Sequence, residues 1–462
     1  MFVAGVSNKH FFTMNFNYDL FVIGAGPGGL AASEQAATYK AKVAIAEQDL
    51  VGGTCVIRGC IPEKLMSFAA EFSENYQQAV SYGWSQDEIA FDWQQFIAAK
   101  EQEIHRLGQV HTQSLENAGI DLISGRARFI DPHTLEVGGR MITADKILIA
   151  VGGNVVKPNI PGSEYGIIPH QLFNLQQQPK HLAIIGGDNI AVKLAGIMNG
   201  LGSQVTLIIQ EDQILSGYDD DIRMAVAEGL IRRGIQICDR TVVKEIEPVE
   251  DEFNLFLAGN YQNTLKVNKV LYAATRIPNV SGLALEKVGV KVNQGAVVVD
   301  EYNRTTQGNI FAVGDCTNRW SYTPVAIAQA RAFADTEFGN NPHTISYEYI
   351  PSTVSSHPEA ATVGWSEAKA REQLGDAVRC YYKNFRPLLY SLPKRDEKIL
   401  MKLIVGESEN QVLGAHMVGE GAIEIIQCLA LALRMGATKQ DFDQTIGIHP
   451  SVAEEFFTMR EV

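Results

Sequence analysis

Two cysteines in the first part of the sequence are the side chains best suited to redox chemistry. Cys55 and Cys60 have four residues between them, about one helical turn, so both sulfurs can lie on one face and form or break a bond without refolding. In a cytosolic protein such a pair is more often catalytic or sensing than structural, although two buried thiols that never pair are the alternative. No metal site is predicted, because the remaining cysteines lack ligand spacing: Cys238, Cys316, Cys380 and Cys428.

A histidine and a carboxylate near the end of the sequence are residue types that could transfer protons to and from those sulfurs. Glu454 follows His449 by five residues. Thiolate chemistry needs a proton donor and acceptor that works near neutral pH, and a histidine oriented by a carboxylate supplies one. Taken alone, such a pair is more often an ordinary surface or packing feature.

The segment before the cysteines is patterned as a dinucleotide-binding unit. An apolar run at residues 18–23 predicts a strand, an Ala-rich helix follows a glycine-rich turn, and a second strand closes on Glu47. In that turn Gly24 permits the tight bend, Gly26 lets a pyrophosphate approach the backbone, and Gly29 allows close helix packing. Glu47 can hold a ribose hydroxyl. The alternative is a plain glycine-rich turn.

A second unit of the same kind begins with the apolar residues 181–185. It continues through Gly186-Gly187-Asp188-Asn189-Ile190-Ala191 and a helix to a strand at residues 204–209, so two nucleotide-binding domains are expected. Further on, Asp315 ends another apolar strand. Thr323 and a proline then open a helix whose free N–H groups can turn toward an electron-rich ring.

The bulk composition indicates a soluble protein of several domains. The 462 residues exceed what one hydrophobic core usually organises, and the net charge of -14 argues against binding to nucleic acid or an anionic membrane. No run in the first 17 residues is long enough to span a bilayer or act as a signal peptide, so we expect a cytoplasmic protein. Met14 is an alternative to Met1 as the start residue.

Together these motifs resemble the pyridine-nucleotide-disulfide oxidoreductases, and within them the glutathione reductases, from Tyr18 to the C-terminus. The most specific matches are the runs at residues 52–62, 311–316, 356–364 and 448–460. The resemblance implies an α/β fold with two Rossmann-like nucleotide-binding domains, for FAD and for NAD(P), plus a C-terminal α+β dimerisation domain. The expected bounds are 15–154 and 279–347 for the FAD-binding domain, 155–278 for the NAD(P)-binding-like domain and 348–462 for the dimerisation domain.

The resemblance also implies residue roles. Cys55 would attack the disulfide substrate, and Cys60 would form a charge-transfer contact with the flavin. His449, supplied by the other subunit and held by Glu454, would be the acid-base residue, so that the active site needs a homodimer. The implied FAD contacts are Gly24, Gly26, Gly29, Glu47, Gly53, Thr54, Asp315 and Thr323.

The second nucleotide unit departs from the family pattern. After Gly186, Asp188 replaces a glycine, and its negative charge opposes a diphosphate. Asn189 replaces the tyrosine that covers the nicotinamide pocket in the family. Where NADPH-dependent members carry two arginines for the 2'-phosphate, this chain has Gln210 and Ser216, and one basic residue remains, Arg276. We therefore expect weak or absent NADPH binding.

Two further departures concern charge. In the family, a lysine after the second cysteine pairs with a glutamate on the helix of the second nucleotide unit. Here these positions are Glu63 and Lys193, so we predict an ion pair of reversed polarity. The alternative is that both are solvated and unpaired. On the disulfide-substrate side, Glu34 stands where a basic helix face is expected and His111 replaces a tyrosine, whereas Arg331 is kept.

Three hypotheses for the function follow. The leading one is an FAD-dependent dithiol/disulfide oxidoreductase that uses Cys55 and Cys60. It exchanges electrons by a route other than the usual NADPH site, and its partner is a protein or small-molecule disulfide or dithiol. The second is an ordinary NADPH-dependent glutathione-disulfide reductase. The third is a flavin-binding regulatory or interaction protein without turnover.

Overall fold

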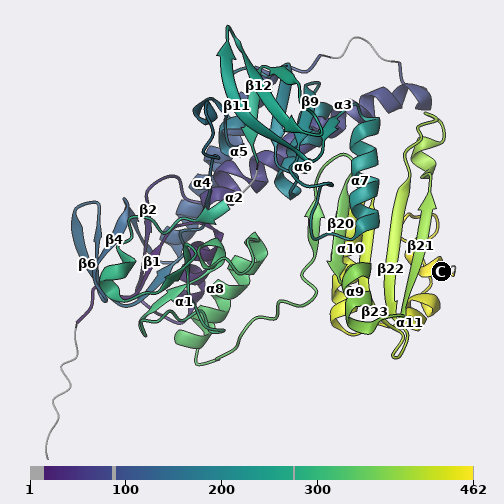
Figure 1. Ribbon diagram of the computed structural model, residues 1–462. Coiled ribbons are helices and arrows are strands. Elements are labelled where there is room, and N and C mark those ends of the chain that lie inside the picture. Colours follow the sequence, from purple (N-terminus) through teal and green to yellow (C-terminus); the bar gives the residue numbers. More distant parts are fainter. Residues whose placement is uncertain (1–14, 86–89, 274–275, 461–462) are drawn as a thin grey trace, which may run out of the picture. The chain divides into compact units, whose positions relative to one another are not determined.

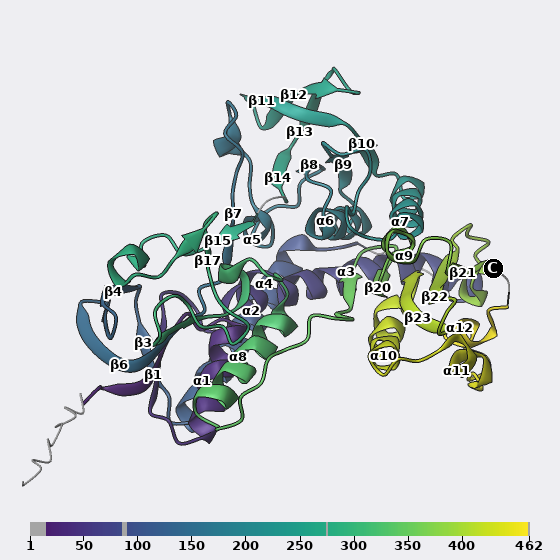
Figure 2. The same cartoon turned by 60° about the horizontal axis from the view of Figure 1, so that its bottom comes forward.

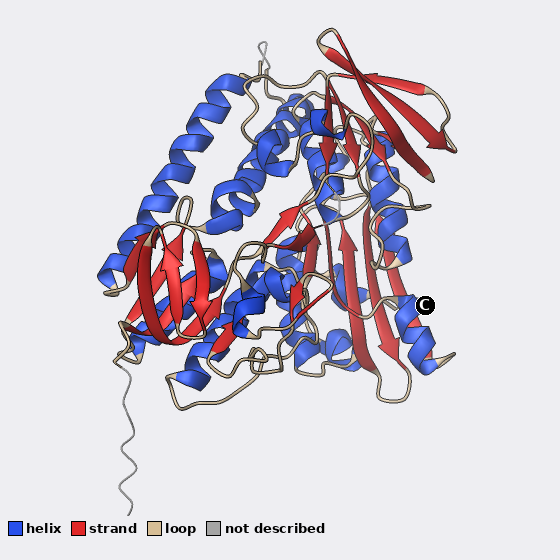
Figure 3. Cartoon of the chain, turned by 60° about the vertical axis from the view of Figure 1, so that its left-hand side comes forward, coloured by secondary structure: helices blue, strands red, loops and turns tan. Residues whose placement is uncertain are grey.

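The computed structural model describes residues 15–85, 90–273 and 276–460 (Figure 1). The two alternative start residues, Met1 and Met14, lie outside the described residues. The chain divides into two compact units. Met1–Ile57, His105–Asn154 and Ile277–Ile345 form the first, and Arg58–Ile104, Val155–Arg276 and Ser346–Val462 form the second. Helices and strands are present in both (Figure 3), which confirms the predicted α/β class, while the four domain bounds stay predictions.

A mostly parallel sheet forms the centre of the first unit. Its parallel strands run in the order β3 (Asp121–Ser124), β2 (Val43–Glu47), β1 (Tyr18–Ile23), β6 (Arg140–Ile149) and β18 (Ile310–Ala312). β6 also pairs antiparallel with β5 (Thr134–Val137), which pairs with β4 (Ala127–Asp131). α1 (Pro27–Thr38) and α8 (Thr323–Glu337) pack against each other in this unit (Figure 2).

Strand β1 is buried on both faces, which explains its continuous apolar sequence. Leu20 and Val22 pack with residues of α1 and α8 on one side. Phe21 and Ile23 join a separate core on the other side, together with residues of β4 and β5. Since successive residues of a strand point to opposite faces, one short run supplies both cores and fixes where the turn after Ile23 emerges.

The second unit contains a smaller parallel sheet and an antiparallel one. The parallel order is β10 (Gln236–Cys238), β9 (Gln204–Ile208), β8 (His181–Ile185) and β14 (Lys269–Tyr272), and the antiparallel order is β11 (Thr241–Val249), β12 (Glu252–Gly259) and β13 (Thr264–Val267). The helices of this part are α3 (Cys60–Ala79), α5 (Pro169–Leu172), α6 (Asn189–Gly200) and α7 (Asp220–Arg232).

The C-terminal part of the second unit is a five-stranded antiparallel sheet with helices (Figure 1). The strand order is β19 (Ser352–Val354), β20 (Ala360–Gly364), β23 (Gln411–Val418), β22 (Ile399–Gly406) and β21 (Val378–Phe385). α10 (Ala422–Arg434) packs against β20 and β23, and the other helices are α9 (Glu367–Leu374), α11 (Lys439–Gln444) and α12 (Glu455–Thr458). The core of this sheet is apolar, but Lys402 of β22 is buried and forms ion pairs with Asp219 and Asp221 at the start of α7.

The remaining elements are short or run across the boundary between the units. α2 (Gly53–Arg58) and α4 (Trp93–Asn117) cross it, and the short strands are β7 (Gly153–Val155), β15 (Arg276–Pro278), β16 (Val292–Asn293) and β17 (Ala296–Val297). In the part of the chain that the structure describes, no helix has the length and apolar character that crossing a bilayer requires.

Candidate functional site

The first glycine-rich turn has a backbone that only glycine fits at two positions. Gly24 has a φ of +103°, and a Cβ there would lie 2.6 Å from the Ala150 carbonyl oxygen. A Cβ at Gly29 would lie 1.9 Å from the Gly24 carbonyl oxygen, so the helix can pack on the turn only without a side chain. At Gly26, by contrast, a Cβ would meet nothing closer than 3.8 Å. The absence of a side chain at Gly26 therefore leaves room beside the backbone.

The amino end of α1 is open to an anion. Gly26 is the N-cap residue with φ −78° and ψ 179°, and no side chain caps the first turn of the helix. The first N–H groups of a helix lack partners within the helix and attract negative charge. Gly53 packs its Cα directly against this turn, since a Cβ at Gly53 would lie 2.5 Å from the Gly26 Cα. These residues fit the pyrophosphate of a dinucleotide.

The other predicted cofactor residues surround the same edge of the first sheet. Glu47 ends β2, and its carboxylate accepts hydrogen bonds from the N–H groups of Ala25 at 2.9 Å and Gln48 at 2.8 Å. Thr54 lies in α2, Asp315 follows β18, and Thr323 begins α8. The structure thus brings the glycine turn and Glu47 together at the carboxyl ends of β1 and β2, where open parallel sheets bind ligands.

The two cysteines lie on consecutive helices, so the expectation of one continuous helical turn is wrong. Cys55 is half-buried in α2, and Cys60 is the exposed first residue of α3. Between them Gly59 leaves the helical region, with φ −146° and ψ −111°. The cause is Pro62, which has no N–H to donate to the Arg58 carbonyl and whose ring would collide with it in a continuous helix. The boundary between the two units falls between the cysteines, after Ile57.

The C-terminal histidine and glutamate contact each other as the sequence suggested. His449 Nδ1 lies 3.0 Å from Glu454 Oε1 and 3.1 Å from Oε2. The Ser451 N–H also donates to Glu454, and the histidine side chain is 81% exposed. A carboxylate at Nδ1 fixes the tautomer with the proton on that nitrogen, so Nε2 is left to accept a proton. His449 is therefore oriented but solvent-accessible in the single chain.

The second glycine-rich turn carries its own carboxylate. Asp188 is the N-cap of α6 with φ −78° and ψ 179°, and its side chain accepts a 2.9 Å hydrogen bond from the Ala191 N–H. Burial is the largest effect on Asp188 and raises the pKa of its carboxyl, while the Ala191 and Ile190 N–H groups and the charge of Lys193 partly offset that rise. A negative group of the chain thus occupies the amino end of α6.

The other residues predicted for the second nucleotide site have surroundings of their own, and one of them, Arg276, lowers the pKa of the Asp188 carboxyl by its charge. The Asn189 side chain donates to the Tyr218 hydroxyl at 2.8 Å and to the Thr353 carbonyl at 2.5 Å, which ties it into the packing of α6. Gln210 and Ser216 are exposed after β9, and Arg276 is half-buried. Gly186 bends the chain after β8 with φ +135°. Sequence reasoning missed Tyr218, because no local pattern links it to Asn189.

The predicted ion pair of exchanged charges is present. Lys193 Nζ, on α6, lies 3.2 Å from Glu63 Oε1, in the first turn of α3. Their side chains are only 15% and 13% exposed, respectively. The alternative, two separately solvated charges, is therefore wrong.

The three substrate-side residues lie on three helices of the first unit. Glu34 on α1 accepts a 2.8 Å hydrogen bond from the Ser114 hydroxyl of α4. His111 precedes Ser114 on α4 and is half-buried, and Arg331 is exposed on α8. Sequence reasoning missed Ser114, which lies 80 positions from Glu34 and carries no motif.

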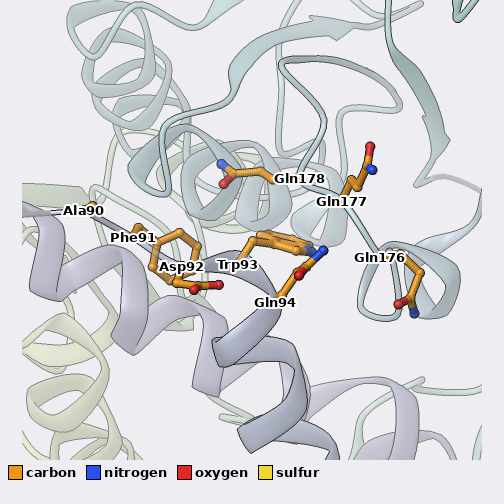
Figure 4. Close-up of a pocket in the computed structure, with 8 residues that line it drawn as sticks. All are labelled: Ala90, Phe91, Asp92, Trp93, Gln94, Gln176, Gln177 and Gln178. Atoms are coloured by element: carbon orange, nitrogen blue, oxygen red, sulfur yellow. The ribbon is translucent and has the colours of Figure 1, made fainter.

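Two cavities of the second unit are lined by residues other than the predicted catalytic ones. One, of about 420 Å³, is shown in Figure 4 and is lined by residues 90–94 and 176–178. Trp93 and three consecutive glutamines are among the residues that line it (Figure 4). A second, of about 460 Å³, is lined by residues of α3, α7 and the C-terminal sheet, with Lys64 next to Glu63 at its edge.

Comparison with known proteins gives consistent matches over nearly the whole chain. The family model described as pyridine nucleotide-disulphide oxidoreductase matches residues 18–330, and that of the corresponding dimerisation domain matches residues 350–460. Glutathione reductase of Nostoc sp. is 53% identical, covering 97% of this chain and 100% of its own. Glutathione reductase of Burkholderia cepacia is 44% identical, covering 96% and 99%.

A plant relative and a solved structure extend the comparison. The chloroplastic/mitochondrial glutathione reductase of Pisum sativum is 42% identical, with 96% of this chain and 82% of its own covered. The HOCl-induced flavoprotein disulfide reductase RclA from Escherichia coli has a TM-score of 0.87 and 28% identity, covering 96% of this chain and 99% of its own. The chain therefore belongs to the pyridine nucleotide-disulphide oxidoreductase family and is a flavoprotein disulfide oxidoreductase.

Proposed function

We propose that this protein is an NADPH-dependent glutathione-disulfide reductase that works as a homodimer with FAD. Three relatives named glutathione reductase match most of the chain, and they support this hypothesis better than the leading one from the sequence. The observation that carries the proposal is the contact of His449 Nδ1 with Glu454, because it prepares an acid-base group for thiol chemistry. The dimerisation-domain match supports the pairing of two chains.

The first unit would hold FAD, which transfers electrons between a nicotinamide donor and the cysteine pair. The amino end of α1 with Gly24, Gly26 and Gly29 would bind the pyrophosphate, and Glu47 a ribose hydroxyl. Gly53, Thr54, Asp315 and Thr323 complete the proposed cofactor contacts.

The cysteines and the histidine would then reduce the substrate in two exchanges. The Cys55 thiol gives its proton to His449 Nε2 and attacks one sulfur of the disulfide, forming a mixed disulfide, and the departing thiolate takes that proton back from His449 Nε2. Cys60 then gives its proton to His449 Nε2 and attacks the Cys55 sulfur, which closes the Cys55–Cys60 disulfide and expels a second thiolate that takes this proton from His449. One disulfide and two thiols thus become two thiols and one disulfide, and Glu454 stabilises the charged histidine between the steps.

Turnover assays test this proposal. The purified flavoprotein should oxidise NADPH when glutathione disulfide is added, Cys55→Ser should abolish that turnover, and Glu454→Gln should lower kcat about 10- to 100-fold because the histidine loses its orienting charge. Cys428→Ser is the matched control, since Cys428 is exposed on α10, outside the proposed site. Unchanged kcat in Cys55→Ser would disprove the proposal.

Asp188 favours a second candidate, in which the same redox centre receives electrons from another donor. Its carboxylate already bonds the Ala191 N–H at the amino end of α6. A diphosphate there would lose that donor and meet a like charge, and two such charges about 4 Å apart repel by ~1–4 kcal/mol. This candidate keeps the dithiol/disulfide chemistry and assigns the donor to a protein or small thiol.

Anaerobic titration separates the two candidates. If NADPH at micromolar concentration bleaches the flavin absorbance, the NADPH-dependent reductase is supported. If NADPH at millimolar concentration leaves the flavin oxidised while dithiothreitol bleaches it, the second candidate is supported instead. Failure of both reagents would contradict both candidates, because each requires a cysteine pair that exchanges electrons with the flavin.

A further inference from the structure

Equivalent backbone hydrogen bonds show which residue of the second unit corresponds to Glu47. In the first unit the Gly24 N–H donates to the carbonyl of the residue before Glu47 at 2.9 Å, and in the second the Gly186 N–H donates to the carbonyl of the residue before Ile209 at 3.0 Å. In dinucleotide-binding folds an acid at this position binds the ribose 2'-hydroxyl of NAD, whereas an arginine nearby accommodates the 2'-phosphate of NADP.

The residue at this position of the second unit is apolar. Ile209 is 1% exposed, and a Cβ at Gly187 would lie 3.0 Å from its side chain, so it packs against the glycine-rich turn. An isoleucine accepts no hydrogen bond from a ribose hydroxyl, and the next residue, Gln210, is exposed and uncharged. The position that selects for NAD in other folds therefore has no carboxylate here.

An arginine from the neighbouring strand lies beside this position. β10 pairs in parallel with β9 (Figure 2), so the two strands end at the same edge of the sheet. Beyond β10, the Arg240 N–H donates to the Glu211 carbonyl at 2.9 Å, and the Thr241 N–H donates to the Ile209 carbonyl at 2.9 Å. These two bonds flank Gln210 and fix the backbone of Arg240 next to it.

The backbone of Arg240 has a conformation that residues other than glycine rarely adopt. Its φ of +44° lies in the left-handed region, where a side chain is strained and glycine is not. The Arg240 carbonyl accepts a 3.2 Å hydrogen bond from the Asn260 N–H, and the Asn260 side chain donates to Asp239 at 3.1 Å. Hydrogen bonds thus hold a corner that an arginine does not stabilise, and such strain is commonly kept at functional positions.

The guanidinium of Arg240 is exposed and weakly paired. The side chain is 65% exposed, and Nη2 lies 4.0 Å from the Asp212 carboxylate, which is itself 64% exposed. Exposed ion pairs of this kind contribute little to stability. Arg223 also lies near Asp212, but it is 17% exposed, pairs with Asp220 at 2.8 Å and donates to the Ile214 carbonyl at 2.9 Å. Arg223 therefore holds the segment after β9, while Arg240 presents N–H donors to solvent.

We propose that Arg240 recognises the 2'-phosphate of NADPH and makes the protein prefer NADPH to NADH. A guanidinium carries a permanent charge and a planar fork of N–H donors that matches a phosphate. Arg240 provides, from a neighbouring strand, the charge that Gln210 and Ser216 lack, and the carboxylates of Glu211 and Asp212 limit the preference. The inference rests on the proposed function, because it names the residue by which the same site selects its donor.

Equilibrium binding to the flavin-containing protein tests this assignment without turnover. Adenosine 2',5'-bisphosphate carries the 2'-phosphate but no diphosphate to meet Asp188. In isothermal titration calorimetry, Arg240→Gln should weaken its binding about tenfold or more, and Arg240→Lys should weaken it less because a point charge remains. The control is Arg232→Gln, since Arg232 is 41% exposed and pairs with Glu228 within α7 at 3.7 Å, and it should change nothing.

Two further variants separate recognition from a structural role. Arg240→Gly removes the strained side chain together with its charge, so the melting temperature should rise while the affinity for the bisphosphate falls. Gln210→Arg in the Arg240→Gln protein places a cation beside the lost one and should recover most of the affinity. A purely structural arginine would instead give a lower melting temperature in Arg240→Gly and no recovery.

Steady-state kinetics distinguish failure of this inference from failure of the proposed function. Arg240→Gln should raise the KM for NADPH about tenfold or more without lowering kcat, and should leave the KM for NADH unchanged. The inference alone is wrong if the protein reduces glutathione disulfide with NADPH and this KM does not change, or if the wild type binds no bisphosphate. The proposed function alone is wrong if glutathione disulfide is not reduced while Arg240→Gln still loses affinity for the bisphosphate.

Discussion

The two glycine-rich turns of the molecule have the same backbone conformation at the N-cap of the helix that follows. They differ in whether a side chain of the protein caps that helix. Gly26 and Asp188 both cap a helix with φ −78° and ψ 179°, and each turn begins with a glycine of positive φ. At α1 no side chain caps the helix, whereas at α6 the Asp188 carboxylate bonds the Ala191 N–H. The fold therefore sets the shape of a dinucleotide turn, but a single side chain decides whether the helix end is left for a ligand.

The presence of a side-chain cap on α6 and its absence on α1 also imply a trade-off between the stability of the protein and the binding of a ligand at the helix end. An aspartate at an N-cap stabilises a protein by about 1 kcal/mol relative to alanine, because it satisfies an N–H group that otherwise lacks a partner. The uncapped α1 forgoes that stabilisation. We interpret the uncapped amino end of α1 as a binding site for the phosphates of a cofactor. We interpret the capped amino end of α6 as more stable but with a lower affinity for a phosphate.

The largest effect is expected when the first turn is made to resemble the second. Gly26→Asp has room for its Cβ, so the fold should survive, but a carboxylate at the amino end of α1 should reduce the flavin content roughly tenfold or more through repulsion of the pyrophosphate. The ratio of flavin absorbance to protein absorbance measures this. Gly26→Ala adds a Cβ without charge, and its flavin content should stay much closer to that of the wild type. Equal losses in the two variants would show that space, rather than charge, matters at this position.

A smaller effect is expected from the acids at the end of the second strand of each dinucleotide motif, Glu47 at the end of β2 and Glu211 after β9. Glu47→Gln should weaken flavin binding about tenfold, since a charge-assisted hydrogen bond contributes roughly 1.5–3 kcal/mol. Glu211→Gln is the matched change after β9, where Glu211 is exposed, and should leave flavin binding unchanged. Flavin dissociation constants from fluorescence quenching provide the measurement, and a comparable loss in both variants would contradict the assignment of the cofactor to the first unit.

The smallest effect concerns the stability of the second turn as the pH changes. Because the pKa of Asp188 is raised from its ordinary value of 3.8, the folded protein binds this proton more tightly than the unfolded chain does. The Asp188 contribution to stability is therefore greatest at low pH and declines as the pH rises above about 4. An asparagine side chain at this position does not titrate, so the melting temperature of Asp188→Asn relative to wild type should increase between pH 4 and pH 7. A difference that stays constant over that interval would disprove the raised pKa.

The sequence was sufficient to predict the features that depend on local pattern. The apolar residues 18–23 form β1, the glycine spacing before α1 corresponds to positions where a Cβ would collide, and His449 contacts Glu454. The exchanged pair, Glu63 and Lys193, was also predicted, because a resemblance to the family related two positions that lie far apart in the sequence.

Other features could not be predicted because their causes are not local or were given too little weight. The break at Gly59 follows from Pro62, whose effect on the helix was present in the sequence and was overlooked. The hydrogen bonds of Glu34 with Ser114 and of Asn189 with Tyr218 join separate helices or loops, and their polar side chains have no spacing that links them. Tertiary packing alone brings these partners together.

The most direct test of the contrast between the two turns is the affinity of wild-type protein and of Asp188→Gly for NADPH, measured by isothermal titration calorimetry. Gly186 and the α6 backbone already have the required geometry, so removal of the carboxylate should tighten NADPH binding at least tenfold, equivalent to about 1.4 kcal/mol. An Asp188→Gly protein that binds NADPH no more tightly than the wild type would contradict the account.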